Sequence, residues 1–183
     1  YVGAFEPWHG ITVLLNALAQ VVAQGVPVHL DLIGDGSELG TVERMIVEHK
    51  LTAHVSLHGF LRIGEAAPIL ASCEIGLSPY CGRVEYSGLK LLDYKAAGLA
   101  TIASGENGEP FVLRHGVTGW IVAPCDVEQL TDAIVTLCRN AELRRCIGQA
   151  ARLEAEEQHS WRHTAQQLEQ IFTQVTAKVA PAV

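Results

Sequence analysis

Short apolar runs alternate with segments of helical periodicity along most of the chain. Strands are predicted over residues 1–5, 28–33, 54–57, 74–77, 100–103 and 120–122. Helices are predicted over residues 9–24, 39–50, 63–71 and 88–97, where apolar side chains recur at three- and four-residue spacing. Such alternation is typical of a parallel sheet covered by helices. We therefore predict an α/β fold, a Rossmann-like three-layer αβα sandwich with about six parallel strands.

The last third of the chain has a different pattern. A short helix is predicted through Val112, and from Asp126 onward the chain becomes helical, with Asp126 and Gln129 at capping-box spacing. Two more helices are predicted over residues 144–156 and 161–175. The second of these carries an apolar side made of Trp161, Ala165, Leu168, Ile171 and Phe172.

Residues 85–98 read E-Y-S-G-L-K-L-L-D-Y-K-A-A-G and place two acids, Glu85 and Asp93, eight positions apart. Ser87 and Gly88 suit the start of a helix, because serine caps free amides and glycine lets a ligand approach the backbone. The amides and dipole of a helix start favour phosphate, so the acids would lie on either side of a bound phosphate. The alternative is an ordinary amphipathic helix with a solvated acid at each end.

Ligands of an open parallel sheet bind beyond the carboxyl ends of its strands, so the loops there are the candidate sites. His9 precedes a helix and would donate to a phosphate, and Gly10 would tighten the turn; a solvent-facing histidine is the alternative. Phe60 offers a flat ring for a nucleobase, or else is a core residue.

Two further loops carry weaker signals. Residues 34–36 read G-D-G, which is only part of a dinucleotide fingerprint and is equally explained by a tight turn. Glu106 and Glu109 would meet sugar hydroxyls, although a solvated loop is the favoured interpretation. The sequence shows no D-x-D pair and no His–Cys cluster, so it predicts no metal site.

Charge and cysteine content narrow the function classes. The 183 residues carry a formal net charge of −7, which argues against nucleic acid and anionic membranes as partners but leaves a small phosphorylated ligand open. No run of about 18 apolar residues could span a bilayer. The five cysteines show no C-x-x-C spacing, which favours reduced thiols in a cytoplasmic protein. Because the chain opens inside a strand, without a methionine, we expect a piece of a longer protein.

The chain resembles the donor-binding half of GT-B glycosyltransferases, in particular the large retaining family four. Five motifs carry this resemblance in order: Y-V-G-A-F-E-P-W-H-G, L-I-G-D-G-S-E, H-V-S-L-H-G-F, E-Y-S-G-L-K-L-L-D-Y-K-A-A-G and R-H-G-V-T-G-W-I-V-A-P. The resemblance implies that residues 1–183, with C-terminal helices from about residue 126, form a nucleotide-sugar-binding domain. It also implies that an N-terminal acceptor domain is absent from this chain, and that any membrane contact is made through that half.

The resemblance also implies roles for individual residues. Glu85 falls where the family has a catalytic acid near the donor sugar, and Asp93 falls where an acid holds the ribose. The amides of Ser87, Gly88 and Leu89 would receive the distal phosphate. The remaining donor-binding positions implied are Gly3, His9, Gly10, Gly34, Phe60 and Lys90.

The sequence departs from the family pattern at several of these positions. Ala4 stands where an arginine is usual and His9 where a lysine is usual, so the charge on the leaving diphosphate needs another cation. Lys90 is the candidate. Asp93 is shorter than the usual glutamate, and Phe111 stands where an acid is frequent, so sugar contacts in that loop are in question.

The implied function is transfer of a sugar, with retention and without a metal or other cofactor, from a nucleoside-diphosphate sugar to an acceptor. We expect this part alone to bind the donor but to transfer no sugar. The final predicted helix is the candidate for crossing back to the missing half. Two alternatives stay open: a sugar-nucleotide epimerase of the same architecture, and a non-catalytic module that binds nucleotide sugars.

Overall fold

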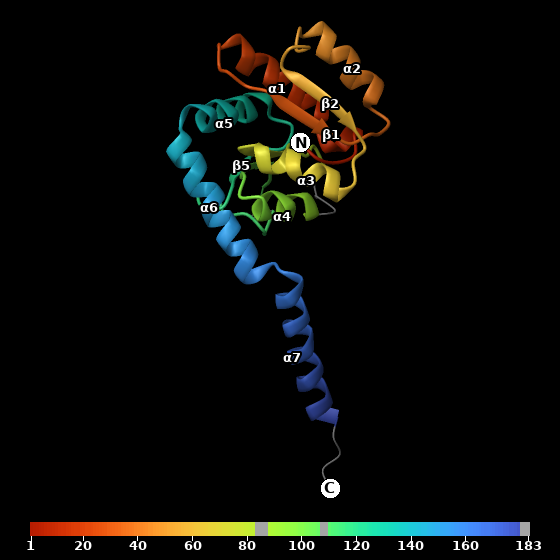
Figure 1. The fold of residues 1–183 in the computed structure, drawn as a ribbon, viewed down its shortest axis with the longest axis vertical. Helices are drawn as coiled ribbons and strands as arrows, with labels where there is room; N and C mark the ends of the chain where they lie inside the picture. The colour runs from red at the N-terminus through yellow and green to blue at the C-terminus, as the bar shows by residue number, and fades with distance from the viewer. Residues whose placement is uncertain (83–87, 107–109, 180–183) are drawn as a thin grey trace.

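The computed structural model describes residues 1–82, 88–106 and 110–179 (Figure 1). A short 3-10 helix, η1, covers Pro7–His9, and the strands are β1 Leu30–Ile33, β2 Val55–Gly59, β3 Ile75–Ser78, β4 Ala100–Ser104 and β5 Trp120–Val122. The helices are α1 Ile11–Ala23, α2 Leu39–Glu48, α3 Ile63–Ser72, α4 Leu89–Ala96, α5 Val127–Arg139, α6 Ala141–Gln158 and α7 Trp161–Val179. The predicted alternation of strands and helices is confirmed.

All strand pairs in the described chain are parallel, in two sheets of order β1-β2 and β3-β4-β5. The predicted count of about six strands is too high by one, because the opening segment pairs with β1 at only one bridge, Val2 to Ile33. Two backbone hydrogen bonds hold it there: the Ile33 amide donates to Tyr1 O, and the Gly3 amide donates to Ile33 O. The segment therefore lies beside β1 like a strand but is too briefly paired to count as one.

The Tyr94 side chain joins this opening segment to the second sheet. Its hydroxyl accepts from the Val2 amide at 2.8 Å and donates to Leu77 O, in β3, at 3.1 Å. The ring packs on Gly76, where an added Cβ would lie only 2.6 Å from ring atoms. A buried tyrosine hydroxyl thus supplies hydrogen bonds where the two sheets lack a direct backbone ladder.

The core lies in two clusters. The larger one joins the buried sides of α1, α2 and α5 to the strands, and α1 packs against both α2 and α5. The smaller one brings Leu70 of α3 and Leu91 and Tyr94 of α4 together with β4, and α4 packs against α6. In Figure 1, α1 lies behind β1 and β2, and α4 and α5 pack against the strands of the second sheet, so helices cover the strands as predicted.

The predicted short helix through Val112 is wrong: residues 111–112 form a turn, with the Leu113 amide bonded to Pro110 O. The Val112 carbonyl accepts from the Lys95 side chain, so it is engaged outside any local helix. The capping box at α5 is half formed. Asp126 accepts from the Gln129 amide, but the Gln129 side chain accepts from the Ala123 amide instead.

The last helix, α7, extends away from the rest of the chain (Figure 1). Its apolar side is in water, with Trp161 88% and Phe172 63% exposed. The predicted helix is confirmed, but the described residues provide no surface that covers this apolar side. No helix among the described residues combines the length and the hydropathy needed to cross a bilayer.

Candidate functional site

The loops that follow the strands approach one another closely at the carboxyl edge of the sheet, and two glycines permit this. A Cβ on Gly10 would lie 1.5 Å from Pro79 O, and one on Gly34 would lie 1.9 Å from Gly3 O. Gly10 has φ +67 and Gly34 φ +144, values that other residues rarely adopt. Of the predicted site residues, Gly34 therefore lies directly against Gly3, and Gly10 lies against the loop after β3 at Pro79.

Helix α4 starts at this edge. Its first turn, preceded by Gly88, has no side-chain cap, and the side chain of Leu89 is 66% exposed. Amides of a first turn have no partner within the helix and favour an anion. Glu85 and Ser87 lie outside the described residues.

Asp93 is on the exposed side of α4, one turn after the helix starts. The neighbouring chain still shields its carboxyl from water, and this desolvation raises its pKa above the ordinary 3.8. A hydrogen bond donated by a hydroxyl stabilises a carboxyl in that environment. The position therefore suits the predicted contact with a ribose.

Lys90 extends from α4 to the opening segment. Its ammonium lies 4.9 Å from the centre of the Tyr1 ring, a cation–π contact, and a Cβ on Gly3 would lie 3.2 Å from Nζ. The Tyr1 hydroxyl in turn donates to Ala4 O at 2.8 Å. The amino group of Lys90 thus lies beside Gly3, one residue before the position where the sequence lacks the expected cation.

The side chain of His9 contacts the opening segment at Ala4. Its Nδ1 lies 2.7 Å from Ala4 O, so Nδ1 carries the proton and donates to that carbonyl. The Nε2 atom is then a donor only when the ring is protonated, which would add a second positive charge. The ring also contacts Tyr80, with centroids 5.3 Å apart.

Phe60 follows β2, one residue after Gly59, whose carbonyl accepts from the Gly34 amide at 2.8 Å. Its ring is 77% exposed. The alternative that Phe60 belongs to the core is therefore wrong, and the ring is accessible to a planar ligand beside Gly34. At the same edge, the Glu6 carboxylate accepts a hydrogen bond from the Ser37 hydroxyl at 2.7 Å.

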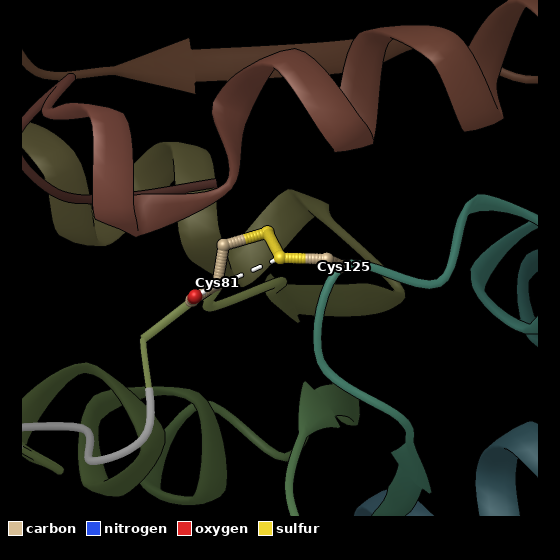
Figure 2. Close-up of a disulfide and its surroundings, with 2 residues drawn as sticks. All are labelled: Cys81 and Cys125. Carbon is tan, nitrogen blue, oxygen red and sulfur yellow. Dashed lines mark hydrogen bonds between the residues drawn. A yellow bond between two sulfur atoms is a disulfide. The ribbon is translucent and has the colours of Figure 1, made fainter.

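Cys81 and Cys125 form a disulfide in the structure (Figure 2), so the prediction that all five thiols are reduced is wrong for these two. Their Cα atoms are 4.9 Å apart although 44 positions separate them in the sequence. The cross-link joins the loop after β3 to the loop after β5, and the Cys81 amide also donates to Trp8 O. Parallel topology brings these loops to one edge, which no cysteine spacing could reveal.

Within the described ranges, no group of three or more His, Cys, Asp or Glu side chains is arranged to hold a metal ion.

Comparison with known proteins shows which family has this arrangement. The family model described as glycosyl transferases group 1 matches residues 1–140. The chain belongs to this family. The match covers every segment of the carboxyl edge described above, from the opening segment to α4.

Curated relatives of this group 1 chain include a phosphatidyl-myo-inositol mannosyltransferase of Mycobacterium leprae, 31% identical over 93% of the chain and 44% of the relative. Another is an N-acetyl-alpha-D-glucosaminyl L-malate synthase of Bacillus anthracis, 29% identical over 88% of the chain and 41% of the relative. The chain spans less than half the length of these relatives.

Solved structures match as well. HepE of Anabaena in complex with UDP has a TM-score of 0.83 at 20% identity, over 94% of this chain and 47% of that one. The C-terminal domain of the group 1 protein LpcC from Francisella tularensis has a TM-score of 0.77 at 19% identity, over 87% of this chain and 84% of that one. These likenesses confirm the predicted fold, a Rossmann-like half of a GT-B architecture.

Sequence reasoning missed three residues of this region. Tyr1 supports Lys90, Tyr94 joins the sheets, and Lys95 is fully buried with one charged partner, Glu154. The signal for Lys95 was weak but present: it lies in an otherwise apolar stretch of the α4 pattern, next to Tyr94 and before two alanines.

Proposed function

We propose that this chain is the donor-binding half of a retaining, metal-independent glycosyltransferase that takes a sugar from a nucleoside-diphosphate sugar. The observation that carries the proposal is the convergence of Lys90 and the start of α4 on the Gly3–Ala4 backbone. A diphosphate bound there would meet the amides of a helix start and a cation, which are the groups that stabilise a leaving diphosphate.

The remaining roles follow from the same placement. We assign the distal phosphate to the amides of Ser87, Gly88 and Leu89, and the ribose to Asp93. Glu85 is proposed as the acid that contacts the donor sugar. The Gly10 amide and the ring of His9 would complete the diphosphate site beside the Gly3 backbone, and Phe60 would face the base beside Gly34.

The length of the relatives supports a second proposal, that an acceptor domain completes the enzyme. Because the chain spans less than half of them, the acceptor and the cleft in which transfer takes place would lie in the other half. We therefore expect this chain to bind nucleotide without transferring sugar.

Calorimetric titration with UDP, GDP and ADP tests the proposal directly. At least one diphosphate is expected to bind, and Lys90→Met is expected to weaken its binding about tenfold, the loss of one charge-assisted contact to phosphate. Arg139→Met is the matched control, since it removes one positive charge from the exposed C-terminal end of α5, away from the carboxyl edge. Binding of none of the three diphosphates contradicts the proposal, and equal losses in both variants contradict the role of Lys90.

A further inference from the structure

Lys95 is a buried cation on the same helix as Lys90 and Asp93. Its side chain is fully buried, with an exposed fraction of 0%. Its ammonium donates to Val112 O and to Glu154 Oε1, both at 2.8 Å. A lysine is buried as an ion only when such partners replace water, so this group has a defined position.

The partners of Lys95 belong to two other segments. Glu154 is on α6, and its second oxygen accepts from the Arg114 guanidinium at 2.6 Å. Val112 and Arg114 belong to the turn at residues 110–114, which is therefore held at two points: at the Val112 carbonyl directly, and at the Arg114 side chain through Glu154. One buried ammonium thus ties α4, α6 and this turn together.

The anchored turn lies at the start of α4. A Cβ on Gly88 would come to 3.9 Å from Val112 Cγ2, which is ordinary van der Waals contact. The next residue, Leu89, begins the helix whose first amides are proposed to receive the distal phosphate. A shift of Val112 would therefore change the space directly beside those amides.

We propose that Lys95 is a positioning residue: through Val112 and Glu154 it holds the turn at residues 110–114 against the start of α4, and so sets the affinity of that start for a distal phosphate. The inference rests on the proposed function. It assigns to Lys95 a role in ligand affinity that is separate from its part in folding.

The test compares the diphosphate that binds best in the titration above with the monophosphate of the same base, which lacks the distal phosphate. Lys95→Met keeps a long buried side chain and removes the ammonium. It is expected to weaken diphosphate binding about tenfold while monophosphate binding changes less than about twofold. Arg114→Met removes only the contact between Arg114 and Glu154. It is expected to weaken diphosphate binding by a smaller factor, about threefold, with the same small effect on monophosphate binding.

Arg44→Met, which removes an exposed guanidinium paired with Glu48 on α2, is the control and is expected to change neither affinity. If Lys95→Met does not fold, the selectivity of Arg114→Met decides. Equal weakening of both nucleotides, or no weakening of either, would overturn the positioning role. Failure of the unsubstituted chain to bind any diphosphate would overturn the proposed function first, and this inference with it.

Discussion

Replacing Gly10 by alanine tests how closely the loops of the carboxyl edge must approach. Gly10 and Gly59 share the same positive φ, +67, so alanine is strained by its φ at both. The surroundings differ: a Cβ on Gly10 would lie 1.5 Å from Pro79 O, whereas a Cβ on Gly59 would meet nothing within 4 Å. Gly59→Ala is therefore the matched control for backbone strain.

The left-handed conformation costs an alanine about 1–2 kcal/mol at either position. At Gly10 the Pro79 carbonyl must also move by about 2 Å to reach ordinary contact, and forcing extra volume into a packed site costs about 1–3 kcal/mol. We expect Gly59→Ala to lower the free energy of unfolding by about 1–2 kcal/mol and Gly10→Ala by about 2–5 kcal/mol. The moved segment includes Tyr80, which contacts His9, so diphosphate affinity should fall as well.

Urea unfolding followed by circular dichroism measures the two free energies, and titration with diphosphate measures the affinities. The decisive quantity is the difference between the two variants, because it cancels the shared backbone strain. If Gly10→Ala and Gly59→Ala are destabilised equally and bind diphosphate equally, the close approach at Pro79 has no energetic role and the reasoning fails.

Three more predictions concern the body of the domain. Gly148→Ala would place a Cβ 2.1 Å from Gly98 O and is expected to lower the free energy of unfolding in urea by about 1–3 kcal/mol. Gly40→Ala, with open space around the added Cβ, should raise it by about 0.5–1 kcal/mol, and similar stability of the two variants would contradict this packing. Burial raises the pKa of Glu154, but hydrogen bonds from its two cationic partners outweigh that effect and lower the pKa below 4.5, so its stabilisation is present at neutral pH and lost as pH falls through the lowered value. Unfolding from about pH 7 to about pH 3 should therefore show a steeper loss in the parent than in Glu154→Gln, and parallel curves would refute the ion pairs. Reducing the Cys81–Cys125 disulfide, which closes a loop of 44 residues, is expected to lower the free energy of unfolding by up to about 4 kcal/mol. Urea unfolding with and without dithiothreitol measures this loss, and an equal effect of the reductant on Cys81→Ser would exclude the cross-link.

Local pattern predicted the elements well. The apolar spacing of α1, α2 and α5 and the short apolar runs of β1 and β4 are properties of about ten neighbouring residues, and each appears in the structure within a few positions of its prediction. The pattern failed at Val112, which lies in a turn whose position depends on a distant side chain, Lys95, that donates to the Val112 carbonyl. It also gave one strand too many, because pairing of residues 1–5 depends on a distant partner.

The candidate site was predicted as a set of positions, each in a loop after a strand or at the start of a helix. In the structure Gly34 lies against Gly3, Gly10 lies against Pro79, and the Lys90 ammonium lies beside Gly3. The parts that could not be predicted are contacts between segments far apart in the sequence.

By itself the sequence determined the order of strands and helices, the glycine turns at the carboxyl edge and the helix start that favours an anion, because each of these depends on a short stretch of chain. Only the tertiary structure decided that Lys90 lies against Gly3, that Cys81 meets Cys125, and that Lys95 is buried between Val112 and Glu154. The physical reason is that these contacts form after parallel strands have been ordered side by side, and that order is a property of the packed chain as a whole.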